Sequence, residues 1–141
     1  MGKRIALKDL IEIDGNDLSN FCRSVEFSSE HEQVDVSGFN PTGANEFLAG
    51  QTVQSVTLEM FGAYGTGETH DVLYDIHRDR SIVNFRWRPD QTQPVSATNP
   101  QLTGNVQILT YGPGATRGEP DVFSVTLSAA DAAGLVFVTT A

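Results

Sequence analysis

The sequence predicts a mainly β fold, a β-sandwich or barrel-like domain with one flanking α-helix and long loops. Polar and apolar residues alternate with a period of two in about seven stretches, and one short segment has the 3.6-residue period of a helix. Many strands without intervening helices are typical of a sandwich or barrel rather than a doubly wound fold. The predicted strands are residues 5–13, 21–27, 51–61, 81–88, 104–111, 121–128 and 133–140.

The first predicted strand, IALKDLIEI (5–13), alternates only roughly and ends at the turn signal Asp14-Gly15. We therefore expect residues 1–20 to form either a first strand or an N-terminal arm. The basic start of the chain is not followed by the long apolar run of a signal peptide.

The second predicted strand, FCRSVEF (21–27), alternates cleanly, which places Cys22 on the face opposite Phe21, Val25 and Phe27. Cys22 is the only cysteine, so we expect no disulfide and no Cys-based metal site. An inert small side chain is the favoured interpretation, with a reactive thiol as the alternative. A chain without disulfides is expected to be made in the cytoplasm.

Three later strands have clear apolar faces, and each face is expected to point into the core. The residues that share a face are Val56, Leu58 and Met60, then Val83, Phe85 and Trp87, and then Phe123, Val125 and Leu127.

The helix is predicted over Thr69 to Arg78. Thr69 can cap its N-terminus, and Asp71 suits the positive end of the helix dipole. A narrow apolar stripe would pack the helix on one sheet face, and its members are Val72, Leu73 and Ile76.

GAYGTGET (62–69) resembles a phosphate-binding P-loop in the spacing of Gly62 and Gly67 and in Thr69, but it has Glu68 where that motif needs lysine. A carboxylate at this position would repel the phosphates. We therefore expect this stretch to connect a strand to the helix and to bind no nucleotide, and we expect no cofactor.

Composition and charge restrict the function further. The 141 residues suffice for a single domain, 1–141, with 39% hydrophobic and 19% charged residues, and no apolar run approaches the ~20 residues of a membrane span. The net charge of −9 argues against binding nucleic acid or an anionic membrane surface. Within EFSSEHEQVD, four acidic residues occur without Lys or Arg, and they are Glu26, Glu30, Glu32 and Asp35.

No catalytic or metal-binding pattern stands out. His70 and His77 are seven residues apart without a third committed ligand, and His31 is remote in sequence. DGNDLSN resembles the start of a calcium loop, but Val25 stands where the bidentate glutamate belongs. Paired carboxylates of a glycosidase stay open at this point. We expect a protein that is not an enzyme.

Two long loops are predicted, at 37–50 and 89–100, and long loops in compact domains are often functional. In the first loop, Phe39, Phe47 and Leu48 are candidates for anchoring a neighbouring subunit, because aromatic residues often anchor interfaces. The alternative is that these side chains fold back on their own sandwich.

The order of features resembles the major tail tube protein of bacteriophages with long non-contractile (siphovirus-type) tails. The resembling segments cover roughly residues 20 to 130, and PVSATNP before TGN is the most specific. They are VDVSGF, NEFLAGQ, QSVTLEMFG, HDVLYDI, NFRWRPDQTQPVSATNPQLTGNVQILTY and DVFSVTLSAAD.

The resemblance implies a structural virion protein that assembles into hexameric rings. The rings stack into a tube whose acidic lumen delivers DNA into the host without binding it specifically. Its partners would be other copies of itself and the tail tip, tape measure and tail terminator proteins, with no membrane contact. It would be located in the virion tail after synthesis and assembly in the host cytoplasm. The stacking loop would hold Phe39, Phe47 and Leu48.

The four acidic residues would then line the lumen, and the rival interpretation is a solvated hairpin outside the tube. Two other functions stay open. One is a different virion protein on a similar sandwich, for capsid decoration or tail completion. The other is a carbohydrate-binding or hydrolase module that uses exposed aromatic residues such as Trp87.

Overall fold

One strongly curved antiparallel sheet of eight strands makes up most of the computed structural model, which describes residues 3–39 and 41–140. The strand order is β2-β1-β5-β6-β7-β4-β3, and β8 pairs with β6 beside this path. The elements are β1 (Leu10–Ile13), β2 (Asn16–Asp17), a short 3-10 helix (Ser19–Phe21), β3 (Cys22–Asp35), β4 (Phe47–Phe61), α1 (Thr69–Asp79), β5 (Val83–Arg88), β6 (Gln101–Tyr111), β7 (Val122–Ala129) and β8 (Val136–Val138).

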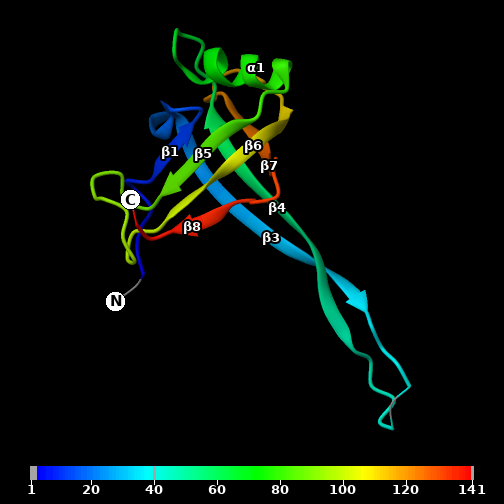
Figure 1. Ribbon diagram of the computed structural model, residues 1–141. Coiled ribbons are helices and arrows are strands. Elements are labelled where there is room, and N and C mark those ends of the chain that lie inside the picture. Colours follow the sequence, from blue (N-terminus) through cyan, green and yellow to red (C-terminus); the bar gives the residue numbers. More distant parts are fainter. Residues whose placement is uncertain (1–2, 40, 141) are drawn as a thin grey trace.

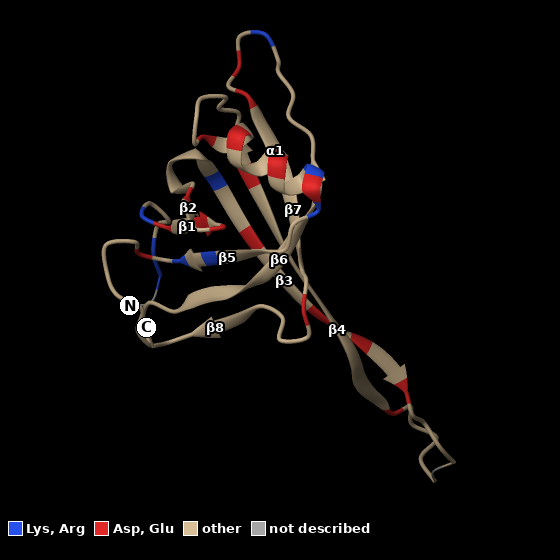
Figure 2. Ribbon diagram, turned by 45° about the horizontal axis from the view of Figure 1, so that its top comes forward, with Lys and Arg blue, Asp and Glu red and all other residues tan. Residues whose placement is uncertain are grey.

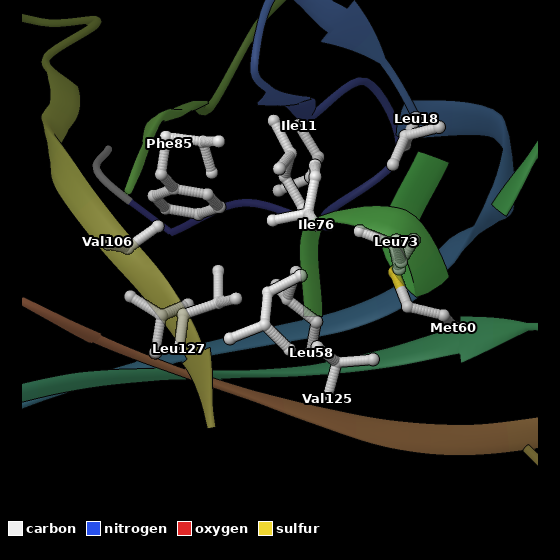
Figure 3. Packing of buried hydrophobic residues seen from close by; sticks show 14 of the residues in the cluster. Ile11, Leu18, Leu58, Met60, Leu73, Ile76, Phe85, Val106, Val125 and Leu127 are labelled. Atoms are coloured by element: carbon white, nitrogen blue, oxygen red, sulfur yellow. The ribbon is translucent and has the colours of Figure 1, made fainter. Parts of the chain in front are cut away.

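The curvature brings two parts of the sheet face to face around a single apolar core. Figure 3 shows Ile11 and Phe85, from β1 and β5, on one side of the core and Leu58 and Leu127, from β4 and β7, on the other. All four side chains are buried. The sequence prediction of a mainly β, sandwich-like domain with one flanking helix is therefore confirmed.

The predicted inward faces agree with the core, because alternation in a strand sends every second side chain to one side. Eight of the nine residues expected there are buried, and Trp87 packs against the core at its margin. The buried eight are Val56, Leu58, Met60, Val83, Phe85, Phe123, Val125 and Leu127.

Helix α1 closes the core where the curved sheet opens, and it crosses one end of the strands in Figure 1. Its apolar stripe contributes Leu73 and Ile76 to the core. The helix begins at Thr69 as predicted, but Thr69 is not its cap. Glu68 has the extended backbone of a cap residue, so Thr69 lies inside the first turn, where its hydroxyl is buried and has no hydrogen-bond partner in the described chain.

Several strand boundaries differ from the prediction. The first strand begins at Leu10 rather than at residue 5, and residues 3–9 run outside any strand. This segment is held at Asp9, whose carboxylate accepts hydrogen bonds from Arg4 Nη1 at 2.9 Å and from Trp87 Nε1 at 2.8 Å. Trp87 is therefore occupied by its own chain and does not form an exposed aromatic platform.

Cys22 lies on the core side of the sheet, which corrects its predicted place opposite Val25 and Phe27. The pairing register of β3 with β4 shifts between Cys22 and Ser24, and such a bulge reverses the alternation of side chains. Burial raises the pKa of the Cys22 thiol to about 11, which agrees with an inert side chain.

Candidate assembly surfaces

The β3–β4 hairpin continues far beyond the core, and we call its outer part, residues 28–54, the arm (Figure 1). Cross-strand pairing continues from Ser28 opposite Ser55 to Asp35 opposite Phe47. Every described residue from 28 to 53 is exposed, so this part of the arm has no covering layer from its own subunit, and Gln54 at its base is partly buried.

The arm exposes apolar side chains along its length. Phe39 is fully exposed, Phe47 is 47% exposed and Leu48 is 62% exposed. The alternative that these three fold back on their own sandwich is therefore wrong. Phe47 and Leu48 also do not belong to a loop, because β4 begins at Phe47 and the connection between the strands spans only 36–46.

A two-stranded hairpin without a covering layer is only marginally stable in water. The arm also contains a register shift between His31 and Gln33, opposite Gly50. A side chain at Gly50 would come within 2.8 Å of a methyl carbon of Val34, so the Val34 side chain would have to shift to make room for it. An exposed, irregular hairpin with apolar side chains is a surface that gains stability by binding a partner.

The four acidic residues predicted as one group lie on two faces of β3. Val25 and Phe27 face the core, and strand alternation therefore places Glu26, Glu30 and Glu32 on the opposite face. Strand alternation places Asp35 on the other face of the strand, and its place on a lumen wall stays a prediction. The backbone N–H of Ser37 donates to its carboxylate at 2.8 Å, and hydrogen bonds from Ser37 lower the pKa of Asp35.

The outward side of the neighbouring strands extends the same surface, which we call the acidic face. In one row across the sheet, Glu26 lies opposite Thr57, and Thr57 lies opposite Thr126. The face is mostly hydroxyl, amide and carboxylate, with the exposed apolar side chain of Leu109 near Gln107 on β6. Its members are Ser24, Glu26, Ser28, Glu30 and Glu32 of β3, Val53, Ser55, Thr57 and Glu59 of β4, Ser124, Thr126 and Ser128 of β7, and Gln107 and Thr110 of β6.

Sequence reasoning missed Glu59 and the Ser/Thr rows, although the same alternation that identified the core implies them on the other face. It also missed the full extent of the charge asymmetry. Residues 24 to 77 contain nine acidic residues and no Lys or Arg. Arg23 sits at the edge of the face, with its Nε 3.9 Å from a Glu59 carboxylate oxygen. Figure 2 shows acidic residues but no basic ones along the arm.

In the glycine-rich stretch before α1, backbone N–H groups donate hydrogen bonds to carboxylates of the same chain. The backbone N–H of Gly65 donates to Glu68 Oε1 at 2.7 Å, and that of Gly67 donates to Asp71 Oδ2 at 2.8 Å. In a P-loop, such backbone N–H groups cradle phosphate instead. Here the two carboxylates already occupy them, which gives a physical reason to expect no nucleotide binding.

The histidines make structural contacts. His70 Nδ1 lies 2.7 Å from the Tyr111 hydroxyl, and His77 Nδ1 lies 3.1 Å from the carbonyl oxygen of Ile108. His31 pairs with Thr52 across the arm at 2.8 Å. Over residues 3–39 and 41–140, no group of three or more His, Cys, Asp or Glu side chains has an arrangement that could hold a metal ion. The same residues include no helix long and apolar enough to span a membrane.

Comparisons with known proteins place this fold among tail and baseplate assemblies. No family model and no curated protein matches the sequence. A chain in the virion of a native gene transfer agent particle matches with a TM-score of 0.74 and 17% identity, over 96% of this chain and 99% of that one.

Two further matches come from symmetric assemblies. One is a chain in the tail of an empty gene transfer agent particle with C6 symmetry, with a TM-score of 0.66 and 18% identity over 84% of this chain and 82% of that one. The other is a chain in the six-fold symmetrised anti-feeding prophage baseplate, with a TM-score of 0.63 and 16% identity over 96% and 95%. At such identities the likeness establishes the fold, which agrees with the sequence resemblance to a tail protein.

Proposed function

We propose that this chain is a structural subunit of a phage-type tail that self-assembles into six-membered rings stacked as a tube. The arm is the observation that carries the proposal. It exposes apolar side chains on a hairpin that its own subunit does not cover, and a surface of this kind is stabilised by a neighbouring subunit. The six-fold symmetry of two matched assemblies supports six as the ring number.

The acidic face is proposed to line the lumen. A duplex binds a surface mainly through cations that neutralise its phosphates, and the strands of this face offer carboxylates and hydroxyls instead. Repetition around a closed ring would give a negatively charged wall that DNA passes without sticking. The proposal assigns no catalytic chemistry and no cofactor to the chain.

The remaining partners follow from the same proposal. A tube needs subunits that close its ends and set its length, so tail tip, tail terminator and tape measure proteins are the expected neighbours. Synthesis and assembly in the host cytoplasm would fit a chain whose single cysteine is partly buried and forms no disulfide.

The similarity to a baseplate chain favours a second candidate, a subunit at the end of a tail that forms one ring and does not stack. Negative-stain electron microscopy of the purified protein at increasing concentration distinguishes the two. Long tubes support the first function, single rings support the second, and monomers at all concentrations contradict both.

A further inference from the structure

A groove on the body of the subunit lies between the N-terminal segment, residues 3–9, and the 89–100 loop. This loop is rigidly built around the buried Asn99. The Asn99 side-chain amide donates to the carbonyl oxygens of Asp90, Gln93 and Pro94 at 3.1 to 3.3 Å, and its Oδ1 accepts from the Asp90 N–H at 3.0 Å. The loop is therefore preformed rather than shaped by a ligand.

The N-terminal segment is fastened to this loop. The backbone N–H of Gln91 donates to the carbonyl oxygen of Lys8 at 2.8 Å. The groove between them has a volume of about 460 Å³, which lies within the usual range for binding pockets. The two walls of the groove are therefore joined to each other by a backbone hydrogen bond.

The lining of the groove combines apolar and basic side chains. Ile5 and Leu7 are 80% and 82% exposed, and Pro94 adds apolar surface from the loop. Lys8 supplies positive charge, whereas the guanidinium of Arg4 is paired with the Asp9 carboxylate at 2.9 Å. The one acidic side chain in the lining belongs to Asp90, and its Oδ1 accepts a hydrogen bond from the Thr92 hydroxyl at 2.6 Å.

The arm has the complementary properties. Its exposed apolar side chains include Val34, Phe47 and Leu48, and the acidic Glu46 directly precedes Phe47 in the chain. The sequence of the arm contains no Lys or Arg. Complementary charge steers association and fixes which surfaces meet, while the apolar side chains supply most of the affinity.

We infer that the groove between residues 3–9 and the 89–100 loop receives the arm of a neighbouring copy of this chain. The inference rests on the proposed self-assembly and adds the surface that accepts the arm. The arm of the same subunit does not reach the groove, because it leaves the body in a different direction (Figure 1). Each subunit therefore donates one arm and accepts another, and such a head-to-tail contact propagates into rings or filaments.

Disulfide cross-linking between two labelled populations tests this contact. One population carries Leu48→Cys on the arm and the other carries Leu7→Cys in the groove, both with Cys22→Ala to remove the native thiol. At about 10 μM protein, an effective concentration of about 1 mM in the docked pair predicts roughly hundredfold faster cross-linking between the two than by random collision. The control pairs Leu48→Cys with Ile82→Cys, which is similarly exposed but lies outside the groove.

Microscopy of the same samples separates this inference from the proposed function. Fast cross-linking in samples with rings or tubes supports both. Fast cross-linking without rings or tubes supports the contact and contradicts the tube. Rings or tubes with cross-linking no faster than in the control overturn the inference alone, and samples with neither overturn both.

Two charge-reversal variants test separately whether charge contributes to the contact between the arm and the groove. Lys8→Glu in the groove population should slow the cross-linking, and Glu46→Lys in the arm population should restore it, with both effects fading as salt is added. Equal rates for all four combinations would show that the charges of the groove and the arm do not meet.

Discussion

Replacing Phe47 and Leu48 together by serine is expected to block assembly and to leave the subunit folded. Both side chains stand on the arm, 47% and 62% exposed, and neither belongs to the core. Their replacement therefore changes little in the free subunit, where surface substitutions usually alter stability by no more than about 0.5 kcal/mol.

The effect on assembly follows from the area that a neighbour would cover. Full burial of a Phe or Leu side chain contributes about 1.5 to 3 kcal/mol, and only about half of each side chain remains to be buried. The pair therefore contributes roughly 1.5 to 3 kcal/mol per contact, which corresponds to a rise of about tenfold to 150-fold in the critical concentration for assembly.

Sedimentation of assembled material over a range of protein concentrations measures this critical concentration, and thermal unfolding reports on the fold. Ile82→Ser is the matched control, since Ile82 is 58% exposed and lies off the arm. A double variant that unfolds would show that the two residues belong to the core. A folded double variant that assembles like the parent would refute the role of the arm.

Three further outcomes follow from local geometry. Gly104→Ala should destabilise the fold by about 1 to 3 kcal/mol in urea unfolding, because the added carbon would lie 2.6 Å from the carbonyl oxygen of Gly134. Gly112→Ala should leave the stability unchanged, because no atom lies within 4 Å of the added carbon. Equal unfolding midpoints for the two variants would contradict the close approach of Gly134, in the segment before β8, to Gly104 of β6. Because burial raises the pKa of the Cys22 thiol to about 11, the stability that it contributes should be complete below pH 9.0 and fall between pH 9.0 and 11. Rapid labelling of Cys22 by a disulfide reagent at pH 8 in the folded protein would oppose this. Titration calorimetry with ATP or GTP and magnesium should detect no binding. A micromolar affinity would contradict the view that the carboxylates of Glu68 and Asp71 occupy the N–H groups of Gly65 and Gly67.

The core was predictable because burial leaves a periodic signal. Val56, Leu58 and Met60 alternate with polar residues, and Leu73 and Ile76 repeat at a helical spacing. Wherever one face of an element is buried and the other is wet, the sequence contains the pattern. The general fold class and the place of the helix follow from it.

The arm was not predictable in the same way, because neither of its faces is buried in the subunit. Residues 28–35 and 47–50 therefore have no consistent apolar alternation, and only the first six residues of β3, 22–27, were predicted as a strand. The face of Cys22 was mispredicted for a related reason, since a bulge breaks the period on which the prediction rests.

Contacts between distant segments leave no local signal at all. The side chain of Gln54 at the base of the arm accepts a hydrogen bond from the N–H of Leu135 at 2.8 Å and donates to its carbonyl oxygen at 2.9 Å. These two hydrogen bonds connect β4 to the segment before β8, with one donor and one acceptor on each side as between paired strands. The groove likewise combines residues 3–9 with 89–100, which only the folded chain brings together.

A cryo-electron microscopy structure of the assembled protein tests the central proposal most directly, because it shows which surface faces the axis. The account predicts a six-fold tube in which Glu26, Glu30 and Thr57 point into the lumen. A tube in which these side chains face outward, around a basic inner wall, would contradict it.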